Sequence, residues 1–287
     1  MSTYKRAPRG ELSSYEADRF THGGTTHDVY RKGRGPAVIV VAELPGITPE
    51  VLGFADRVVA LGCTAVLPNL FGEAGRDPEA GSVLSQRLYA LRSIASVCIR
   101  REFAALALGR TAPVVDWLRA LAAREHARAG GPGVGVVGMC FTGGYALAMA
   151  VDPRVLAPVL AQPSQPLLLR QGSRAAIDCS AADLARVRAR CDREGLRVLG
   201  LRFHDDPFVP AERFDFLRAQ LGDGFVAVEL SQADGHPSSP MPRHHSVLTR
   251  DLIDEPGQPT RVALERVLDL LRSKLLPETE RRVEPTA

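Results

Sequence analysis

The chain has 287 residues, of which 45% are hydrophobic and 24% are charged, values typical of a single soluble globular domain. Its formal net charge is only +3, and its 36 Lys and Arg residues are scattered among 33 Asp and Glu residues, which argues against a nucleic-acid partner. No apolar run approaches the ~20 residues of a membrane span, and no secretory signal opens the chain, so we expect a cytoplasmic protein with no membrane partner.

The first part of the chain predicts strands and helices in alternation after a polar N-terminal segment at residues 1–24. A short edge strand is expected at residues 25–31. The β-branched run at residues 37–42 is apolar on both faces, as in a central parallel strand. A helix is expected to begin at Thr48, whose hydroxyl can cap it, and to end at Ala60.

The middle of the chain contains a long apolar periodicity and a glycine-rich turn. Leucines at helical spacing predict a helical region within residues 82–108, and a second helical stretch ends in residues 114–122. A strand at residues 134–137 then leads through a glycine-rich turn into a small-residue helix at residues 145–150. Further strands are expected at 64–67, 155–160, 196–203 and 225–230, and further helices at 181–191, 211–221 and 261–275.

This alternation predicts an α/β fold with a mostly parallel central sheet and helices on both faces. One domain at residues 25–276 can hold it, followed by a polar tail at residues 277–287. The five cysteines form no CxxC pair and no Cys/His cluster, so neither a disulfide framework nor a metal site is expected. No dinucleotide fingerprint follows the first central strand, and no cofactor is indicated.

The strongest chemical signal is a buried strand that ends in Gly138-Met139-Cys140 and passes directly into a helix. This is the strand-turn-helix context of a nucleophile elbow, in which small neighbours such as Gly138 and Gly143 make room for a strained central residue. The helix N-terminus would favour a thiolate at Cys140. Taken alone, the pattern fits equally well a small buried cysteine in a glycine-rich turn.

Two later features favour the catalytic interpretation. A strand ends in Asp205 and Asp206, at the carboxyl end where α/β enzymes place their catalytic loops. The next strand is followed by a loop with His236, His244 and His245. Each residue alone is more often a turn cap or a solvated side chain. The order nucleophile, acid, histidine is that of α/β-hydrolases, and chance rarely produces it.

Together these segments resemble the dienelactone hydrolases, over about residues 35–275. The resemblance implies an α/β-hydrolase fold and a cofactor-free hydrolase of esters or lactones. It assigns the nucleophile to Cys140, assisted by Asp206 and His245, and implies that Glu43 influences the thiol. The segments that carry the resemblance are Glu43-Leu44-Pro45-Gly46, residues 55–58 and 67–72, the Gly-x-Cys elbow, residues 206–210 and His245-Ser246.

The assignments of the catalytic aspartate and histidine each have an alternative nearby in the sequence. Asp206 is preferred to Asp205 because it directly precedes Pro-Phe-Val-Pro, as in the family. His245 is preferred to His236 because a serine follows it, although Asp234-Gly235-His236 also has the form of a catalytic-histidine segment. In this fold the oxyanion donors are two backbone N–H groups. Their positions fall on Leu44 and Phe141.

The sequence departs from the family at two places. Thr142 stands where the elbow commonly has glycine, which indicates a changed pocket wall or a different turn. The family's carboxylate-binding arginine after the histidine has no match in register, which leaves Arg100 and Arg101 as candidate substrate-binding residues. Two other functions stay open: a degenerate hydrolase fold that only binds a small molecule, and a thioesterase or peptidase of the same fold. The expected partner is a small ester or lactone, and the protein is expected to be a monomer or a homodimer.

Overall fold

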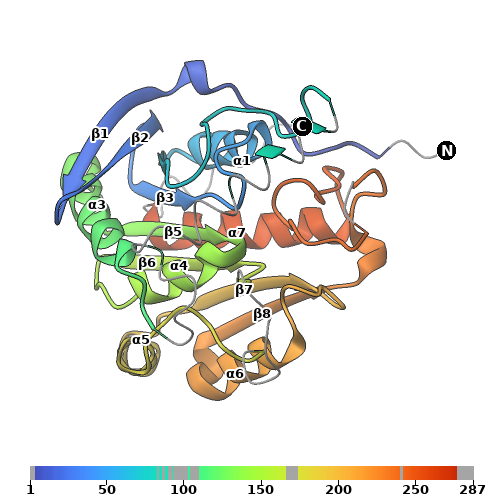
Figure 1. Cartoon of the computed structure of the whole chain (residues 1–287). Coiled ribbons are helices and arrows are strands. Elements are labelled where there is room, and N and C mark those ends of the chain that lie inside the picture. Colours follow the sequence, from blue (N-terminus) through green and yellow to red (C-terminus); the bar gives the residue numbers. More distant parts are fainter. Residues whose placement is uncertain are drawn as a thin grey trace.

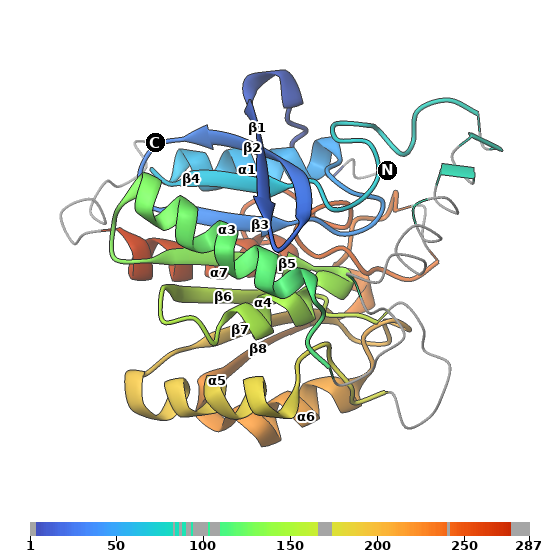
Figure 2. The same cartoon turned by 60° about the vertical axis from the view of Figure 1, so that its left-hand side comes forward.

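The structure is a computed structural model that describes residues 4–82, 84–85, 88–89, 93, 103, 110–165, 174–239 and 242–276. Most of the helical region predicted within residues 82–108 lies outside the described residues, as do Arg100, Arg101 and the tail at 277–287. The described residues form an eight-stranded sheet with helices on both faces (Figure 1 and Figure 2), which confirms the predicted fold class.

The sheet is mostly parallel. Its strand order is β1-β2-β4-β3-β5-β6-β7-β8, with β2 antiparallel to both β1 and β4 and every other neighbouring pair parallel. The strands are β1 (Glu16–His22), β2 (Thr25–Gly33), β3 (Ala37–Val41), β4 (Thr64–Pro68), β5 (Val134–Met139), β6 (Val155–Ala161), β7 (Val198–Phe203) and β8 (Phe225–Leu230).

The edge of the sheet differs from the expectation. The strand predicted at residues 25–31 is present as β2, but it lies between β4 and an additional strand, β1, so the prediction that it is an edge strand was wrong. β1 pairs with β2 along its whole length, from Glu16 opposite Arg31 to His22 opposite Thr25. All of its side chains are exposed or half-buried, and the polar sequence therefore lacks the apolar alternation that reveals a strand.

Helices cover the two faces of the sheet. One face carries α1 (Pro49–Ala60) and α7 (Pro259–Leu275); the other carries α3 (Val114–Ala129), α4 (Gly143–Met149), α5 (Ala181–Glu194) and α6 (Ala211–Leu221), as Figure 2 shows. Local chemistry starts several of them. The Thr48 hydroxyl accepts a hydrogen bond from the N–H of Val51, 3.4 Å away, and the Ser180 hydroxyl caps α5 in the same way.

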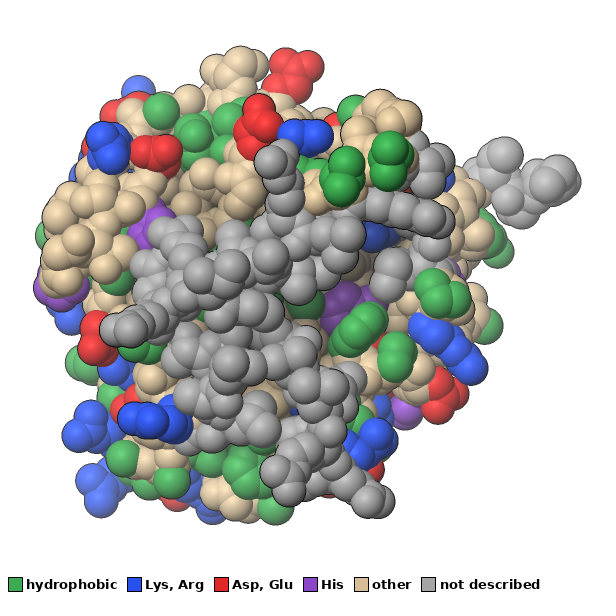
Figure 3. Space-filling model, viewed as in Figure 1, with side chains coloured by type: hydrophobic (Ala, Val, Ile, Leu, Met, Phe, Trp, Pro, Cys, Tyr) green, Lys and Arg blue, Asp and Glu red, His purple; other side chains and the backbone are tan. Residues whose placement is uncertain are grey.

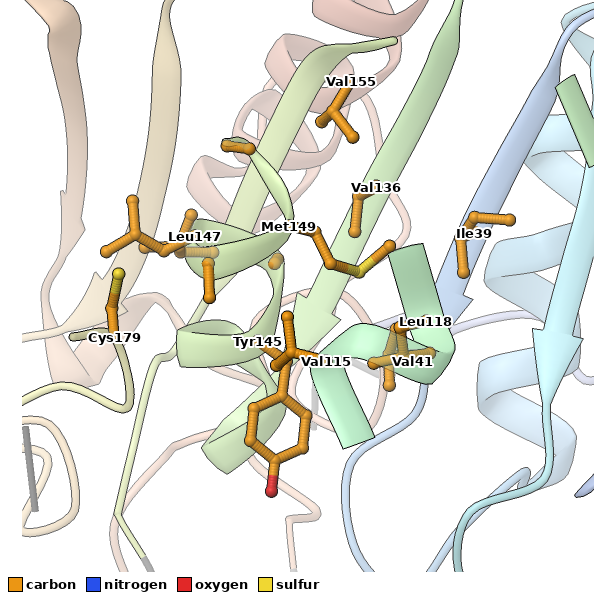
Figure 4. Close-up of a cluster of buried hydrophobic side chains, with 14 of the residues drawn as sticks. Ile39, Val41, Val115, Leu118, Val136, Tyr145, Leu147, Met149, Val155 and Cys179 are labelled. Carbon is orange, nitrogen blue, oxygen red and sulfur yellow. The ribbon is translucent and has the colours of Figure 1, made fainter. Parts of the chain in front are cut away.

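The strands divide the core into two parts because successive side chains point to opposite faces. Ile39 and Val41 of β3 pack on the side of α3 and α4, whereas Val38 and Val40 pack on the side of α1 and α7. Figure 4 shows part of the first cluster, in which Met149 belongs to α4. Each buried aliphatic side chain of this size contributes roughly 1.5–3 kcal/mol to stability. The two cores hold the sheet rigidly under the site.

Parallel strand direction brings the predicted site together. The carboxyl ends of β3, β5, β6, β7 and β8 lie along the same edge of the sheet. The segments that follow four of these strands contain, in chain order, the predicted residues Glu43, Cys140, Asp206 and His245.

The surface carries charges of both signs. On the face shown in Figure 3, basic and acidic side chains are interspersed among the coloured residues. Many charged side chains of the described residues form ion pairs, for example Arg19 with Asp28 and Arg128 with Glu16. None of the helices in the described part of the chain is long and apolar enough to cross a membrane.

Candidate active site

Cys140 occupies a sharp turn between β5 and α4. Its backbone φ is +57°, in the left-handed region that non-glycine residues rarely adopt. The turn leaves no room for side chains around it: a Cβ on Gly138 would lie 2.2 Å from the carbonyl oxygen of Thr142, and one on Gly143 would lie 2.7 Å from the Cβ of Pro163. Strained backbone at one residue, with glycine where the chain is most crowded, is the geometry of a nucleophile elbow.

Thr142 stabilises this turn from inside. Its side chain is fully buried, and its hydroxyl accepts a hydrogen bond from the N–H of Met139 at 2.8 Å. The same hydroxyl lies 2.7 Å from the carbonyl oxygen of Met139 and 2.9 Å from that of Val41. It therefore ties the end of β5 to the end of β3. Of the two interpretations of Thr142 from the sequence, the structure supports a changed turn, because a fully buried residue does not line a pocket.

We expect Thr142→Val to lower the free energy of unfolding by about 1–3 kcal/mol, because an isosteric methyl would leave buried backbone groups of Met139 and Val41 without their partner. Thr142→Ser is the matched control, since it keeps the hydroxyl and removes only a methyl group. Urea unfolding followed by circular dichroism measures both. Equal stability of the two variants would show that the hydroxyl does not hold the elbow.

His245 joins the acid to the nucleophile. Its Nδ1 lies 2.6 Å from Oδ2 of Asp206, and its side chain also interacts with Cys140. Because Nδ1 faces the carboxylate, Nε2 is the ring nitrogen left for the nucleophile. Asp206 is almost wholly buried, and its Oδ1 accepts the N–H of Phe208 at 2.9 Å. The carboxylate is thereby held in place for the imidazole.

The charges around His245 favour its protonated form. Burial by itself would lower the pKa of His245, but the negative charge of Cys140 and the hydrogen bonds to Asp206 and Cys140 raise that pKa well above 6.5. An imidazolium between a carboxylate and a sulfur anion is the resting arrangement of a cysteine nucleophile with its histidine.

The structure separates the candidates that the sequence left open. The side chain of His236 points to the N-terminal segment, where its Nε2 lies 3.2 Å from the carbonyl oxygen of Tyr4 and its Nδ1 accepts the N–H of Ser238. Asp205 is exposed. His245 and Asp206 are the pair that meets at the elbow.

A second carboxylate, Asp251, fixes the loop that presents His245. Its Oδ2 accepts the backbone N–H groups of His245 and Ser246, each at 2.8 Å, and its Oδ1 lies 2.9 Å from Nδ1 of His244. The side chain of Asp251 is fully buried. His244 therefore supports the loop, whereas its neighbour faces the nucleophile.

Glu43 lies at the carboxyl end of β3 and is buried. Its carboxylate accepts hydrogen bonds from Ser246 at 2.8 Å, from the amide of Gln162 at 3.1 Å, and from the hydroxyl of Thr249. Among the described residues, these three donors are the hydrogen-bond partners of its side chain, and Cys140 is not one of them. Glu43 thus links the segments that follow β3 and β6 to the loop of the histidine.

The predicted oxyanion donors lie on neighbouring strand ends. Val41 of β3 pairs in parallel register with Gly138 of β5. Leu44 and Phe141 each follow three residues beyond their member of this pair, so their backbone N–H groups belong to adjacent loops at the elbow. Arg100 and Arg101 lie outside the described residues, so the structure does not place them.

Two residues that the sequence analysis missed contact the site. Ser164, in the segment after β6, has its Oγ 2.9 Å from Sγ of Cys140. Arg213 of α6 is fully buried, and its Nη1 donates to the carbonyl oxygens of Pro163 at 2.8 Å and Phe208 at 2.9 Å. The available signal for Ser164 was its place at the carboxyl end of a parallel strand. For Arg213 we find none, because its sequence neighbourhood is that of an ordinary helix.

Burial lowers the pKa of Arg213 to about 10, while the nearby negative charges of Asp206 and Cys140 act in the opposite direction. A cation close to the sulfur would stabilise its anionic form. Among the described residues, no group of three His, Cys, Asp or Glu side chains has the arrangement of a metal site.

The fold and the order of these residues define an α/β-hydrolase, with the elbow after β5, an aspartate after β7 and a histidine after β8. The sequence model of the dienelactone hydrolase family matches residues 25–196, which is more than half of the chain. The chain therefore belongs to the dienelactone hydrolase family, and the resemblance noted from its motifs is confirmed. Membership in this family supports a hydrolase activity.

Solved structures share the fold at low sequence identity. A dienelactone hydrolase-like promiscuous phosphotriesterase from metagenomic libraries is 18% identical, with a TM-score of 0.54, over 91% of this chain and 98% of that one. A cold-adapted esterase from an Arctic intertidal metagenomic library is 14% identical, with a TM-score of 0.53, over 95% of this chain and 99% of that one. A search of curated proteins found no significant match.

Proposed function

We propose that this protein hydrolyses a carboxylic ester or lactone, with Cys140 as the nucleophile, His245 as the general acid and base, and Asp206 as the residue that orients the histidine. The observation that carries the proposal is the position of His245, whose Nδ1 lies 2.6 Å from Asp206 and whose side chain interacts with Cys140 at a strained elbow. Family membership supports the hydrolase class.

In the first half of the proposed reaction, the thiolate of Cys140 attacks the ester carbonyl, so that a C–S bond forms and the carbonyl electron pair moves to oxygen. The backbone N–H groups of Leu44 and Phe141 stabilise this oxyanion. When the intermediate collapses, the C–O bond to the leaving group breaks, and Nε2 of His245 protonates the leaving oxygen. The acyl group remains on Cys140 as a thioester.

In the second half, the now neutral His245 takes a proton from water, and the hydroxide attacks the thioester carbonyl. Collapse of the second intermediate breaks the C–S bond, releases the carboxylic acid, and restores the thiolate beside a protonated histidine. One ester and one water give one acid and one alcohol. For a lactone, the two products stay in one molecule.

Glu43 has a supporting role in this proposal. Its carboxylate binds Ser246, the residue next to His245, and therefore acts on the nucleophile through the position of the histidine loop. The carboxylate of Glu43 is held by three hydrogen-bond donors, Gln162, Ser246 and Thr249.

The test combines turnover with chemical labelling. We expect the wild-type protein to hydrolyse p-nitrophenyl acetate or a small enol-lactone, and iodoacetamide to label Cys140 first, as mapped by mass spectrometry. Two of the other described cysteines should react more slowly, because burial, assisted by Asp183, raises the pKa of Cys179 to about 12, and burial also raises the pKa of Cys191. Cys179→Ala is the control variant and should label and hydrolyse like the wild type.

The outcomes separate the alternative functions. A labelled Cys140 without hydrolysis of esters or lactones, but with hydrolysis of an acyl-thioester or a peptide, would move the proposal to a different substrate class. An unlabelled Cys140 with no turnover of any substrate would contradict the enzyme and favour a protein that only binds a small molecule.

A further inference from the structure

The segment that follows β6 contacts the nucleophile, although the family resemblance assigns no role to this segment. Ser164 contacts Cys140 twice: its backbone N–H donates to the carbonyl oxygen of Cys140 at 3.0 Å, and its Oγ lies 2.9 Å from Sγ. The serine is almost wholly buried. A surface serine with a chance contact would have neither the second bond nor the burial.

The neighbours of Ser164 hold it in this position. Gln162 has a backbone φ of +37°, its N–H donates to the carbonyl oxygen of Leu201 at 2.7 Å, and its fully buried side chain donates to Glu43. Pro163 receives a hydrogen bond from the buried Arg213. The segment is therefore fixed at two successive residues before Ser164, one of them in a strained conformation that the surroundings must impose.

The chemistry of the contact decides the direction of the bond. A sulfur anion can only accept hydrogen bonds, so when Cys140 is ionised the hydroxyl of Ser164 must donate to it. His245 also interacts with Cys140 and favours its negative charge. Hydrogen bonds to an ionised group are stronger than those between neutral groups. A fixed hydroxyl donor would therefore stabilise the anion more than the histidine alone.

We propose that Ser164 is a further catalytic residue, whose hydroxyl donates a hydrogen bond to the Cys140 thiolate and, together with His245, holds the charged nucleophile ready in the free enzyme. This inference rests on the proposed role of Cys140 as the nucleophile. During attack the sulfur turns its electron pair to the carbonyl carbon, and the hydroxyl keeps its proton throughout. Ser164 thus stabilises the charge without taking part in proton transfer.

The charged groups near the nucleophile stay unchanged in the test that follows, so that an effect can be assigned to the hydroxyl. His245 and Arg213 interact with Cys140. Asp206 contacts His245, and Asp178 interacts with Arg213. Glu43 binds Gln162, two residues before Ser164.

The test compares Ser164→Ala with the wild type by the pH dependence of Cys140 alkylation. The rate constant for alkylation of the folded protein by iodoacetamide is measured from pH 4 to 10. The label is quantified on the peptide that contains Cys140. We expect the midpoint of the profile to rise by about one unit or more in the variant, because a hydrogen bond to a charged group is lost. Below this midpoint, kcat/KM for p-nitrophenyl acetate should fall about tenfold or more.

Two further variants complete the design. Ser164→Thr keeps the hydroxyl and should restore a profile close to that of the wild type. Ser180→Ala removes the hydroxyl that caps α5, so it should lower stability while its alkylation profile stays that of the wild type. If the alanine variant does not fold by circular dichroism, Ser164→Gly takes its place and must show the same rise in the midpoint.

The readouts distinguish this inference from the proposed function. Alkylation needs no ester, so a raised midpoint in a protein that hydrolyses nothing would support the bond from Ser164 and reject the hydrolase. A folded Ser164→Ala or Ser164→Gly protein with an unchanged or lowered midpoint would overturn the inference. An unchanged midpoint would mean that the hydroxyl does not stabilise the thiolate, and a lowered one would mean that the thiol donates to the serine. Full esterase activity in such a variant would leave the hydrolase intact.

Discussion

Cys140→Ala should lower kcat/KM for ester hydrolysis by at least about 10³-fold, because no other group at the elbow can form the covalent intermediate. The sulfur of Cys140 lies 2.9 Å from Oγ of Ser164, and Cys140 also interacts with His245. Alanine fits the turn as far as volume is concerned, although its φ would still be positive. The decrease in kcat/KM is measured with p-nitrophenyl acetate, after correction for spontaneous hydrolysis of the ester.

Cys140→Ala should also lower the pKa of His245. The negative charge of Cys140 is the largest influence that raises the pKa of His245 against the effect of burial. Without it, the pKa of His245 should fall, which NMR of the imidazole ring can follow. A variant with residual activity near that of the wild type, or with an unchanged pKa of His245, would contradict the assignment of Cys140 as an ionised nucleophile.

Asp206→Asn should lower kcat by about 10³–10⁴-fold while the protein remains folded, by analogy with the loss when a triad carboxylate becomes an amide. The amide oxygen can still accept the N–H of Phe208, but the amide nitrogen would face Nδ1 of His245. Nδ1 would then have to give up its proton in order to accept from the amide, and Nε2 would carry the proton on the side of Cys140, so that His245 could not act there as a base. Asp205→Asn is the matched control, because Asp205 is exposed and lies next in sequence.

This variant should also change the dependence of stability on pH. Since the pKa of His245 is raised in the folded protein, its contribution to stability is fully present below the unfolded pKa of about 6.5 and is lost as the pH rises through the folded pKa. Removal of the Asp206 charge should therefore cost more free energy of unfolding at pH 6 than at pH 10. Urea unfolding at the two pH values measures this, and a larger loss at pH 10 would show that the carboxylate does not stabilise an imidazolium.

Much of the fold could be predicted because its signals are local. Strands with β-branched residues, a capping hydroxyl at Thr48, and glycines around Cys140 each depend on residues close together in the chain. The predicted central strands are present, and so are the predicted helices that fall within the described residues. The edge strand β1 was missed for the opposite reason: its polar side chains carry no apolar pattern, and pairing with β2 alone reveals it.

The candidate site also has a part that local motifs predict and a part that depends on tertiary contacts. From the sequence, the elbow and the order of acid and histidine already indicated hydrolase chemistry at Cys140. The sequence preferred His245 to His236 only through the serine that follows it, whereas the tertiary structure shows which ring reaches Asp206, 39 residues away in the chain. The contacts of Ser164 with Cys140 and of Glu43 with Ser246 also join segments that are distant in the sequence.

By itself, then, the sequence determined the class of fold, the family and the residue types available for catalysis, since these follow from periodicity and from short motifs. The tertiary structure decided which side chains meet: Ser164 at the sulfur, Glu43 with Ser246 across 203 residues, and Arg213 behind the elbow. The physical reason is that hydrogen bonds between distant segments depend on how the loops at the carboxyl edge of the sheet pack, and no local pattern records that packing.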